Sequence, residues 1–388
     1  MNHNSEFKIL KDKVILLISP QAWGSLYISK NHYAIELAKS NIVYYLCPEP
    51  KSKVSSHQVV IKSIEGIDNL FIIEHKLFFP FEIKFHFRSF FSFLMYLQTK
   101  RILRKINHKI DIVWSFDLGN YFPFSFFTKV PFKIFHPVDE PLNKDAIISA
   151  KNADIIFSVT NEILDKYSNY KVPKYFVNHG VSESFLNNTN QTEISKSSHL
   201  HVGISGNLRR KDIDRGAMLT IVKNHPEIIF DCWGEYQADS HATNKERSET
   251  DFFIETLKSF SNVKLHGVLN PDNLAKAYLN VDAFLICYDV VKDQSKGTNY
   301  HKVMEFISTG KIIISNNITT YKDSPNLVQM VESRNNNFLL PELFSRTIEN
   351  LDYFNATHFE IERRTFAINN SYKNQLLLID QALISFLN

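Results

Sequence analysis

Short apolar runs recur along the whole chain, and most are followed by a polar loop or by a segment with helical spacing. The runs are rich in β-branched residues and do not alternate with polar ones, which is typical of strands buried on both faces of a parallel sheet. In the first half of the chain the pattern predicts strands at residues 14–18, 42–46, 70–73, 110–116, 132–135 and 153–160. In the second half it predicts strands at residues 201–205, 228–233, 263–265, 283–287 and 312–315.

The segments between these runs carry helical spacing. The clearest helices are predicted at residues 31–38, 274–279, 300–309 and 366–387. Strands that alternate with helices through both halves predict an α/β protein with two doubly wound parallel sheets facing a shared cleft. Residues 187–200 are polar and lack periodicity, so we predict a linker there. The expected organisation is an amino-terminal domain at residues 1–186, a carboxyl-terminal domain at residues 201–365 and a terminal helix at residues 366–388.

The composition fits two globular domains. With 388 residues, 44% of them hydrophobic, the chain is long enough for two cores, and its net charge of +3 gives no reason to expect a nucleic-acid partner. Cys47, Cys232 and Cys287 lie at or beside apolar runs without Cys-x-x-Cys spacing, which predicts buried free thiols in a reducing compartment. The first dozen residues are polar, and the first apolar run is too short for a signal sequence or a spanning helix. We therefore expect a cytoplasmic protein.

The stretch at residues 297–317 has the most specific pattern. Its apolar stripe at helical spacing consists of Tyr300, Val303, Met304 and Ile307. Its polar side consists of His301, Lys302, Glu305 and Thr309. Thr298 or Asn299 is expected to cap this helix, and Gly310 to end it. A helix start behind Gly297 and Thr298 presents free backbone N–H groups, which suit a phosphate, and Glu305 lies within reach of a ribose. The alternative is a capped surface helix with a solvated polar face.

This order of parts resembles the nucleotide-sugar-binding segment of GT-B glycosyltransferases, specifically the family 4-like enzymes of bacterial surface-polysaccharide synthesis. The matching residues are Asn299, Lys302, Glu305, Phe306, Gly310 and Lys311. Many family members carry a glutamate that contacts the donor sugar where this chain has Gly297, and a proline where it has Tyr300. Residues 175–181 also resemble the strand and Asn-Gly-Val turn that close the first domain of this family. The resemblance implies the GT-B fold, with a terminal helix that returns to the first domain.

The resemblance also implies the donor site. The loop after residues 201–205 carries three consecutive cations, and because Asn207 stands where the family has an arginine, one of these cations is expected to bind the pyrophosphate. Residues 262–268 resemble the segment that holds the base against backbone. The expected donor-binding residues are Gly206, Asn207, Arg209, Arg210, Lys211, Glu235, Gly267, Val268, Gly297, Thr298, Asn299, Lys302 and Glu305. An exposed basic turn and a solvated Glu235 are the alternatives.

On the acceptor side, Trp23 and Gly24 follow the strand at residues 14–18, where ligands of parallel sheets bind. A glycine turn beside a half-buried tryptophan is the alternative. His136 and Asp139 follow the strand at residues 132–135, where the resembled family often places a histidine or an acid near the reaction centre. They are the expected catalytic residues, and a structural histidine is the alternative. GT-B enzymes mostly neutralise the diphosphate leaving group with cationic side chains and helix dipoles. We therefore expect no metal, and no cofactor besides the nucleotide diphosphate sugar that is the donor substrate.

The expected function is transfer of a sugar from that donor to a lipid-linked, cell-surface glycan, with retention of configuration. Two alternatives stay open. A nucleotide-sugar 2-epimerase shares the architecture and would act on the donor alone. A catalytically silent sugar-nucleotide-binding partner would explain Gly297 and Asn207.

Residues 78–105 suggest a peripheral membrane contact. The stretch holds more aromatics than one buried helical stripe needs, namely Phe85, Phe87, Phe90, Phe91, Phe93 and Tyr96. Cations lie among or just after them, at Arg88, Lys100, Arg101, Arg104 and Lys105. This pattern fits an element at the inner face of the cytoplasmic membrane, with its cations against anionic lipid. The alternative is that the aromatics fill the core of the first domain.

Overall fold

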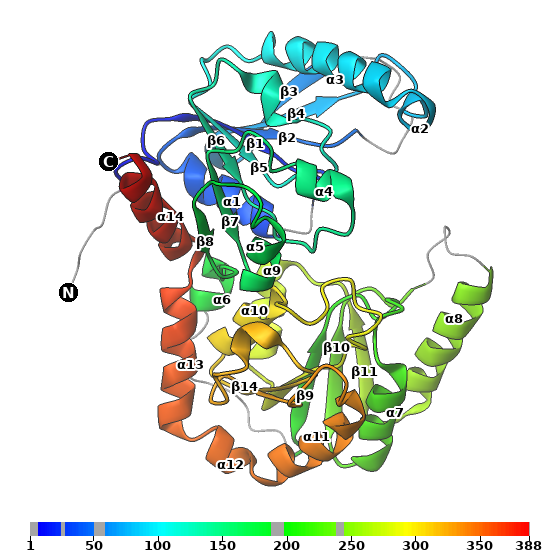
Figure 1. Cartoon of the computed structure of the whole chain (residues 1–388). Coiled ribbons are helices and arrows are strands. Elements are labelled where there is room, and N and C mark those ends of the chain that lie inside the picture. Colours follow the sequence, from blue (N-terminus) through cyan, green and yellow to red (C-terminus); the bar gives the residue numbers. More distant parts are fainter. Residues whose placement is uncertain (1–6, 25–27, 50–58, 188–197, 238–243, 388) are drawn as a thin grey trace. The chain divides into compact units, whose positions relative to one another are not determined.

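The computed structural model describes residues 7–24, 28–49, 59–187, 198–237 and 244–387 (Figure 1). The chain forms two compact units. The first consists of Met1–Asn178 and Tyr372–Asn388, and the second of His179–Ser371. The predicted linker at residues 187–200 lies mostly outside the described residues, and the units divide before it, between Asn178 and His179.

In the described part of the first unit, eight strands form one sheet in the order β3-β4-β2-β1-β5-β6-β7-β8. All neighbouring strands are parallel except β3 and β4. The strands are β1 (Val14–Ile18), β2 (Ile42–Leu46), β3 (Val59–Ile64), β4 (Ile67–His75), β5 (Ile112–Ser115), β6 (Phe132–Phe135), β7 (Ile155–Ser158) and β8 (Lys174–Phe176). The helices are α1 (Ser29–Ala38), α2 (Ile83–His86), α3 (Arg88–Leu103), α4 (Lys144–Ile148), α5 (Asn161–Lys166) and α14 (Tyr372–Leu387).

The second unit contains, among its described residues, six strands in the order β11-β10-β9-β12-β13-β14, all parallel. The strands are β9 (His201–Ser205), β10 (Ile229–Trp233), β11 (Val263–Gly267), β12 (Ala283–Ile286), β13 (Ile312–Ser315) and β14 (Val328–Met330). The helices are α6 (Glu183–Asn187), α7 (Arg215–Asn224), α8 (Asn244–Ser259), α9 (Pro271–Tyr278), α10 (Lys302–Ser308), α11 (Leu340–Glu349), α12 (Leu351–Phe354) and α13 (Thr357–Asn369).

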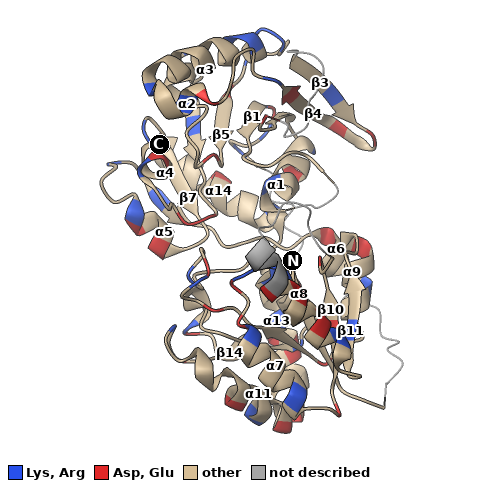
Figure 2. Cartoon of the chain, turned by 90° about the vertical axis from the view of Figure 1, so that its right-hand side faces the viewer, with Lys and Arg blue, Asp and Glu red and all other residues tan. Residues whose placement is uncertain are grey.

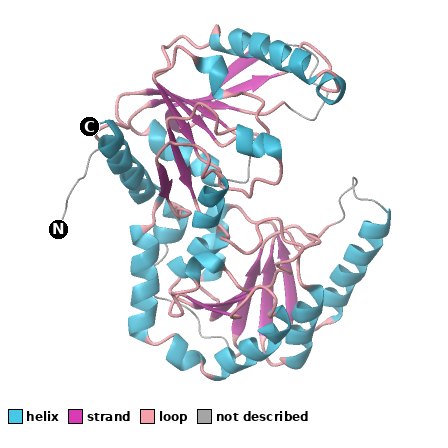
Figure 3. Ribbon diagram, viewed as in Figure 1, coloured by secondary structure: helices cyan, strands magenta, loops and turns pink. Residues whose placement is uncertain are grey.

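Both sheets are buried between helices, which confirms the predicted doubly wound α/β class (Figure 3). Strand β1 shows how the pattern produces this burial. Ile15 and Leu17 pack in one hydrophobic cluster, whereas Leu16 and Ile18 pack in another. Successive side chains of a strand point to opposite faces, so an unbroken apolar run fills a core on each side of the sheet.

The terminal helix differs from the prediction in its bounds. The single helix expected at residues 366–387 is two helices, α13 and α14, which separate at Asn370 and Ser371. Helix α14 belongs to the first unit, where the carboxylate of Asp380 accepts hydrogen bonds of 2.7–2.8 Å from the backbone N–H groups of residues 8–10. The predicted return of the terminal helix to the first domain is therefore confirmed.

The three cysteines are free and buried, as predicted. Burial raises the pKa of the Cys47 thiol to about 11 and that of Cys232 to about 12, so both are neutral thiols. Within the described ranges, no helix is both long enough and apolar enough to cross a membrane.

Candidate functional site

Three neighbouring strands of the second unit end in glycines whose backbones approach one another closely. Gly206, Gly234 and Gly267 follow or end β9, β10 and β11, and all three have positive φ angles. The N–H of Gly206 donates to the oxygen of Trp233, and the N–H of Gly234 donates to the oxygen of Gly267. A Cβ added to Gly234 would lie 1.9 Å from the oxygen of Gly206, so no side chain fits there. The edge of the sheet where ligands bind is therefore lined by bare backbone.

Lys302, the first residue of α10, reaches this edge. Its Nζ donates to the backbone oxygen of Ser205 and, at 2.6 Å, contacts the hydroxyl of Tyr288. A Cβ built on Gly206 would lie 2.6 Å from the same nitrogen, so the glycine makes room for the ammonium group. The structure thus brings together Gly206 and Lys302, which the sequence assigned to one site.

Arg210 is the second cation of this edge. Its guanidinium donates to both carboxylate oxygens of Asp212 and lies 5.4 Å from the ring of Tyr288, which also has the Lys302 ammonium at 4.9 Å. The hydrogen bond with Asp212 raises the pKa of Arg210, and its side chain stays 46% exposed. A charged, oriented and accessible guanidinium suits an anionic ligand.

The other two cations of the loop differ from Arg210. Arg209 pairs with Asp251 of α8 at 2.7 Å, and its side chain is only 9% exposed. The structure therefore gives Arg209 a packing role in place of the predicted pyrophosphate contact. Lys211 is exposed, and the amide oxygen of Asn207 accepts the N–H of Arg209, which shapes the loop.

The loop before α10 is held by Asp293, a residue that the sequence analysis missed. This buried carboxylate accepts hydrogen bonds from the N–H of Gly297 at 3.2 Å and from the hydroxyl of Tyr300 at 2.7 Å. The N–H of Thr298 donates to the oxygen of Ser295. The prediction that Gly297 and Thr298 offer free N–H groups to a phosphate is therefore wrong, because both groups are used within the loop.

The predicted cap of this helix is also wrong. The N-cap of α10 is His301, and no side chain forms a capping hydrogen bond there. Thr298 and Asn299 are buried, and the oxygen of Thr298 accepts the N–H of Thr320, so these residues anchor the loop. Gly310 follows the helix with a φ of 83°, as predicted.

Gly297 has a structural reason to differ from the glutamate of the resembled family. Its φ is 65°, a left-handed value, and an added Cβ would lie 2.5 Å from the oxygen of Asn317. A longer residue at this position requires a different loop.

Glu305 lies in the first turn of α10, where its carboxylate pairs with Nδ1 of His301 at 3.2 Å. The His301 ring packs edge-on against His179 at 5.5 Å between centroids. The remaining residues expected to bind the donor, Gly267, Val268 and Glu235, lie at or just after the ends of β10 and β11. Val268 and Glu235 are exposed, and Glu235 accepts the N–H of Gln237.

In the first unit, His136 is fully buried against the rings of Tyr33, Phe116 and Trp114, with centroid distances of 4.9–6.0 Å. Among the described residues neither ring nitrogen has a hydrogen-bond partner. Burial, assisted by the charge of Lys30, lowers the pKa of His136 to about 3. Such an imidazole is a neutral core residue, so the structure does not support the predicted catalytic role of His136.

The other candidates of the first unit are nearer the solvent. The side chain of Asp139 is 65% exposed and pairs at 3.2 Å with the buried Lys30 at the start of α1. Trp23 is half-buried and packs edge-on against Tyr45 at 5.1 Å, and Gly24 is exposed. Residues 25–27, which follow it, lie outside the described part of the chain.

The burial of His136 predicts acid sensitivity. Its folded pKa of about 3 lies below the ordinary value of 6.5, so below pH 6.5 the unfolded chain binds a proton that the folded chain does not. Stability is therefore present above pH 6.5 and is lost as the pH falls toward 3. Between pH 7 and pH 5 the first unit of the wild type should lose about 2 kcal/mol more than that of His136→Leu, measured by hydrogen exchange at the amides of β5–β7. Equal losses in the two proteins would mean that the imidazole titrates freely and reaches solvent.

Two doubly wound units, with the terminal helix returned to the first, form the GT-B fold of glycosyltransferases. The chain matches no protein-family model and no curated protein sequence, but solved structures share its fold. One is a UDP-forming α,α-trehalose-phosphate synthase from Burkholderia xenovorans in complex with glucose-6-phosphate, with a TM-score of 0.71, 10% identity and coverage of 97% of this chain and 100% of that one.

Two further solved structures show the same likeness. A glycosyltransferase from Rickettsia africae has a TM-score of 0.64 and 14% identity, and the match covers 97% of this chain and 99% of that one. An Anabaena protein in complex with UDP and glucose has a TM-score of 0.63 and 11% identity, with coverage of 96% and 100%. The predicted GT-B fold is confirmed. Identities this low establish the fold and leave the substrate open.

Proposed function

We propose that the chain is a glycosyltransferase that moves a sugar from a nucleotide diphosphate sugar to a saccharide acceptor. The observation that carries the proposal is the position of two cations. The Lys302 ammonium is held against the Gly206 loop, and both it and the Arg210 guanidinium lie beside the ring of Tyr288. Glycosyl transfer from such a donor requires the diphosphate leaving group to be neutralised, and two oriented cations above bare backbone supply that charge. Structures with this fold include a UDP-forming synthase and a complex with UDP and glucose, which supports a nucleotide donor.

The proposed reaction divides between the two units. The second unit binds the donor at the carboxyl ends of β9–β11 and at the start of α10, and the first unit binds the acceptor. Lys302 and Arg210 stabilise the departing diphosphate without a metal ion, and Glu305 binds the ribose. The acceptor is a lipid-linked intermediate of a cell-surface glycan, and the sugar is transferred with retention. The resemblance to family 4-like enzymes supports these finer assignments.

The proposal is tested by nucleoside diphosphate release. A panel of nucleotide sugars is incubated with the protein, with and without a bacterial lipid extract as acceptor. We expect release with one donor, and only when the extract is present. Conversion of the donor to its 2-epimer without acceptor would instead identify an epimerase. No release from any donor would favour a silent nucleotide-binding partner.

Replacement of Glu305 by alanine is expected to weaken donor binding about tenfold or more, because a charge-assisted hydrogen bond to a ribose hydroxyl is worth about 1.5–3 kcal/mol. The first turn of α10 and the His301 contact place this carboxylate on the polar side of the helix. The measurement is calorimetric titration with the donor. Glu349→Ala, at the end of α11, is the matched control and should bind like the wild type. Unchanged affinity in Glu305→Ala would contradict the ribose assignment.

The proposed acceptor requires the enzyme to work beside a membrane, and the outer side of α2 and α3 supports this. Phe85, Phe87, Phe90 and Phe93 are 52–72% exposed there, whereas Phe91 and Met95 on the inner side are buried. The Lys and Arg positions along these helices and just after them are coloured blue in Figure 2. Exposed aromatics beside cations fit the headgroup boundary of an anionic membrane. Phe85, Phe87, Phe90 and Phe93 therefore support the membrane interpretation of residues 78–105, and the buried Phe91 supports the core interpretation.

The protein is expected to co-sediment with anionic vesicles at low salt and to be released at high salt, because each surface cation adds about 1 kcal/mol of screened attraction. Changing Lys100, Arg101, Arg104 and Lys105 to glutamine should leave it in the supernatant. The control changes four exposed lysines of the second unit to glutamine, at Lys223, Lys264, Lys276 and Lys322. If the wild type stays in the supernatant, or if the control is released equally, α3 is not the membrane contact.

A further inference from the structure

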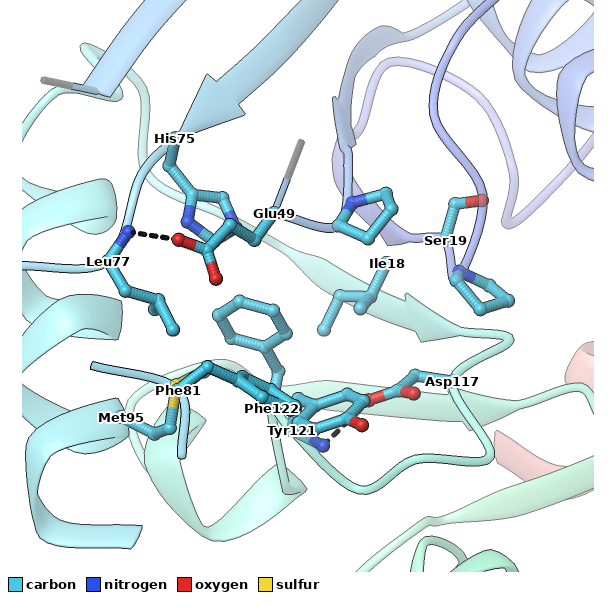
Figure 4. Close-up of a pocket in the computed structure, with 12 residues that line it drawn as sticks. Ile18, Ser19, Glu49, His75, Leu77, Phe81, Met95, Asp117, Tyr121 and Phe122 are labelled. Carbon is cyan, nitrogen blue, oxygen red and sulfur yellow. Dashed lines mark hydrogen bonds between the residues drawn. The ribbon is translucent and has the colours of Figure 1, made fainter. Parts of the chain in front are cut away.

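A cavity of about 480 Å³ lies in the first unit, at the carboxyl ends of β1, β2, β4 and β5 (Figure 4). Its walls are mainly apolar and include Ile18, Leu77, Phe81, Met95 and Phe122. Ligands of parallel sheets bind beyond the carboxyl ends of the strands, and pockets of about 300–1,000 Å³ hold small molecules. Position and size both qualify this cavity as a binding site.

Besides the hydroxyl groups of Ser19 and Tyr121, three polar side chains line the cavity, and they differ in how many hydrogen bonds they form within the protein. Both oxygens of Asp117 accept backbone N–H groups, from Gly119 at 2.7 Å and from Tyr121 at 2.8 Å. Glu49 accepts the N–H of Leu77 at 3.2 Å, the dashed contact beside His75 in Figure 4. Asp117 and Glu49 therefore already have partners within the protein.

His75 is the exception. Its Nδ1 accepts a hydrogen bond of 3.3 Å from the amide nitrogen of Gln98, so the ring proton is on Nε2. The His75 residue is 3% exposed, and its Nε2 has no partner in the part of the chain that the structure describes. Burial lowers the pKa of His75 to about 4, which keeps the ring neutral. The backbone of Cys47 counteracts this lowering of the pKa and so lies near the ring, but no described group is within hydrogen-bond geometry of Nε2.

Aromatic contacts connect the cavity with the exposed side of α2 and α3. The ring of Phe81, in the cavity wall, lies 6.1 Å from that of Phe85 and 5.8 Å from that of Tyr121. Phe85 is 72% exposed, and Met95, which also lines the cavity, belongs to the buried side of α3. Phe81 therefore links the cavity wall to Phe85 of the proposed membrane face.

We infer that this cavity binds an amphiphile, whose alkyl chain packs against the apolar walls and whose head group offers an oxygen to the N–H of His75. An unsubstituted sugar fits poorly, because its hydroxyl groups would face carbon on most sides and lose their hydrogen bonds with water. An alkyl chain gains from each methylene that leaves water. The identification of this amphiphile with the lipid-linked acceptor rests on the proposed function, whereas the ligand class rests on the cavity itself.

The probes are glucose and its butyl, hexyl and octyl glucosides, titrated below their micelle concentrations into the full chain without nucleotide. Calorimetry should show affinity rising about fourfold per added methylene, and no binding of glucose. Equal affinity along the series, or no binding of any member, would overturn the inference. Because no nucleotide is present, this result is independent of donor binding and of transfer.

Variants locate the binding. Phe81→Ser, in the wall, should lower the affinity for octyl glucoside about tenfold, and His75→Phe about fivefold through the lost hydrogen bond. Phe93→Ser is the matched control, since Phe93 is on the exposed side of α3 and does not line the cavity. If Phe93→Ser loses as much as Phe81→Ser, the glucoside binds to the outer face and the inference is wrong. If Phe81→Ser fails to fold, the affinity of His75→Phe for octyl glucoside and the chain-length series still test the inference.

Discussion

Replacement of Lys302 by methionine is expected to lower kcat for glycosyl transfer about 10²–10³-fold, the usual cost of removing one group that stabilises charge in a transition state. The ammonium lies against the Gly206 loop and the Tyr288 hydroxyl, where a diphosphate bound at this edge would meet it. Because the charge on the leaving group grows during transfer, the loss should appear in kcat more than in KM. Steady-state kinetics with the active donor measure both.

The matched control is a lysine that lies just after the same helix. Lys311 follows α10 and pairs with Glu360 of α13 at 2.6 Å. Lys311→Met should keep kcat within about threefold of the wild type, since the Lys311 ammonium is held by Glu360 of α13 and not by the ends of β9–β11. If Lys302→Met retains full kcat, the ammonium does not act on the diphosphate.

Replacement of Gly234 by alanine should destabilise the sheet edge by about 3 kcal/mol or more and abolish donor binding. The new Cβ would lie 1.9 Å from the oxygen of Gly206, and the φ of 126° is strained for any L side chain. Relief requires the ends of β9 and β10 to separate. Hydrogen exchange at the amides of β9–β11 reports this edge directly and does not assume two-state unfolding of two units.

The control is a glycine whose position has room for the methyl group of alanine. Gly216 lies in the first turn of α7, and its added Cβ would be no closer than 3.7 Å to any neighbouring atom. Gly216→Ala should leave donor binding unchanged and stabilise the helix by up to about 1 kcal/mol. Protection of the β9–β11 amides in Gly234→Ala equal to that of the wild type would show that the loops tolerate a side chain.

The fold was predictable wherever apolar runs were uninterrupted. Strands β2 and β13 have the predicted bounds because every residue in them is apolar or small. Strand β3 was missed, since it pairs antiparallel at the sheet edge and is half exposed. The break at Asn370 between α13 and α14 was also missed, because no glycine or proline marks it.

The site was predictable only where its parts are local in sequence. The donor-site roles of the Gly206 loop and Lys302 were predicted from the position of the loop after a strand and from the family resemblance. Tyr288 and Asp293 were missed because their roles depend on contacts made in the folded chain, across the ends of separate strands. His136 was misassigned because a sequence does not reveal whether a histidine after a strand faces solvent or the core.

The most direct measurement of the central claim is calorimetric titration of the full chain with nucleoside diphosphates, each paired with its unphosphorylated nucleoside. One diphosphate should bind at least about tenfold more tightly than its nucleoside, because charge-assisted hydrogen bonds to Lys302 and Arg210 are worth about 1.5–3 kcal/mol each. The double variant Lys302→Met, Arg210→Gln should remove that difference. If no nucleoside diphosphate binds, or if diphosphate and nucleoside bind equally, this edge of the second unit is not a nucleotide-sugar site.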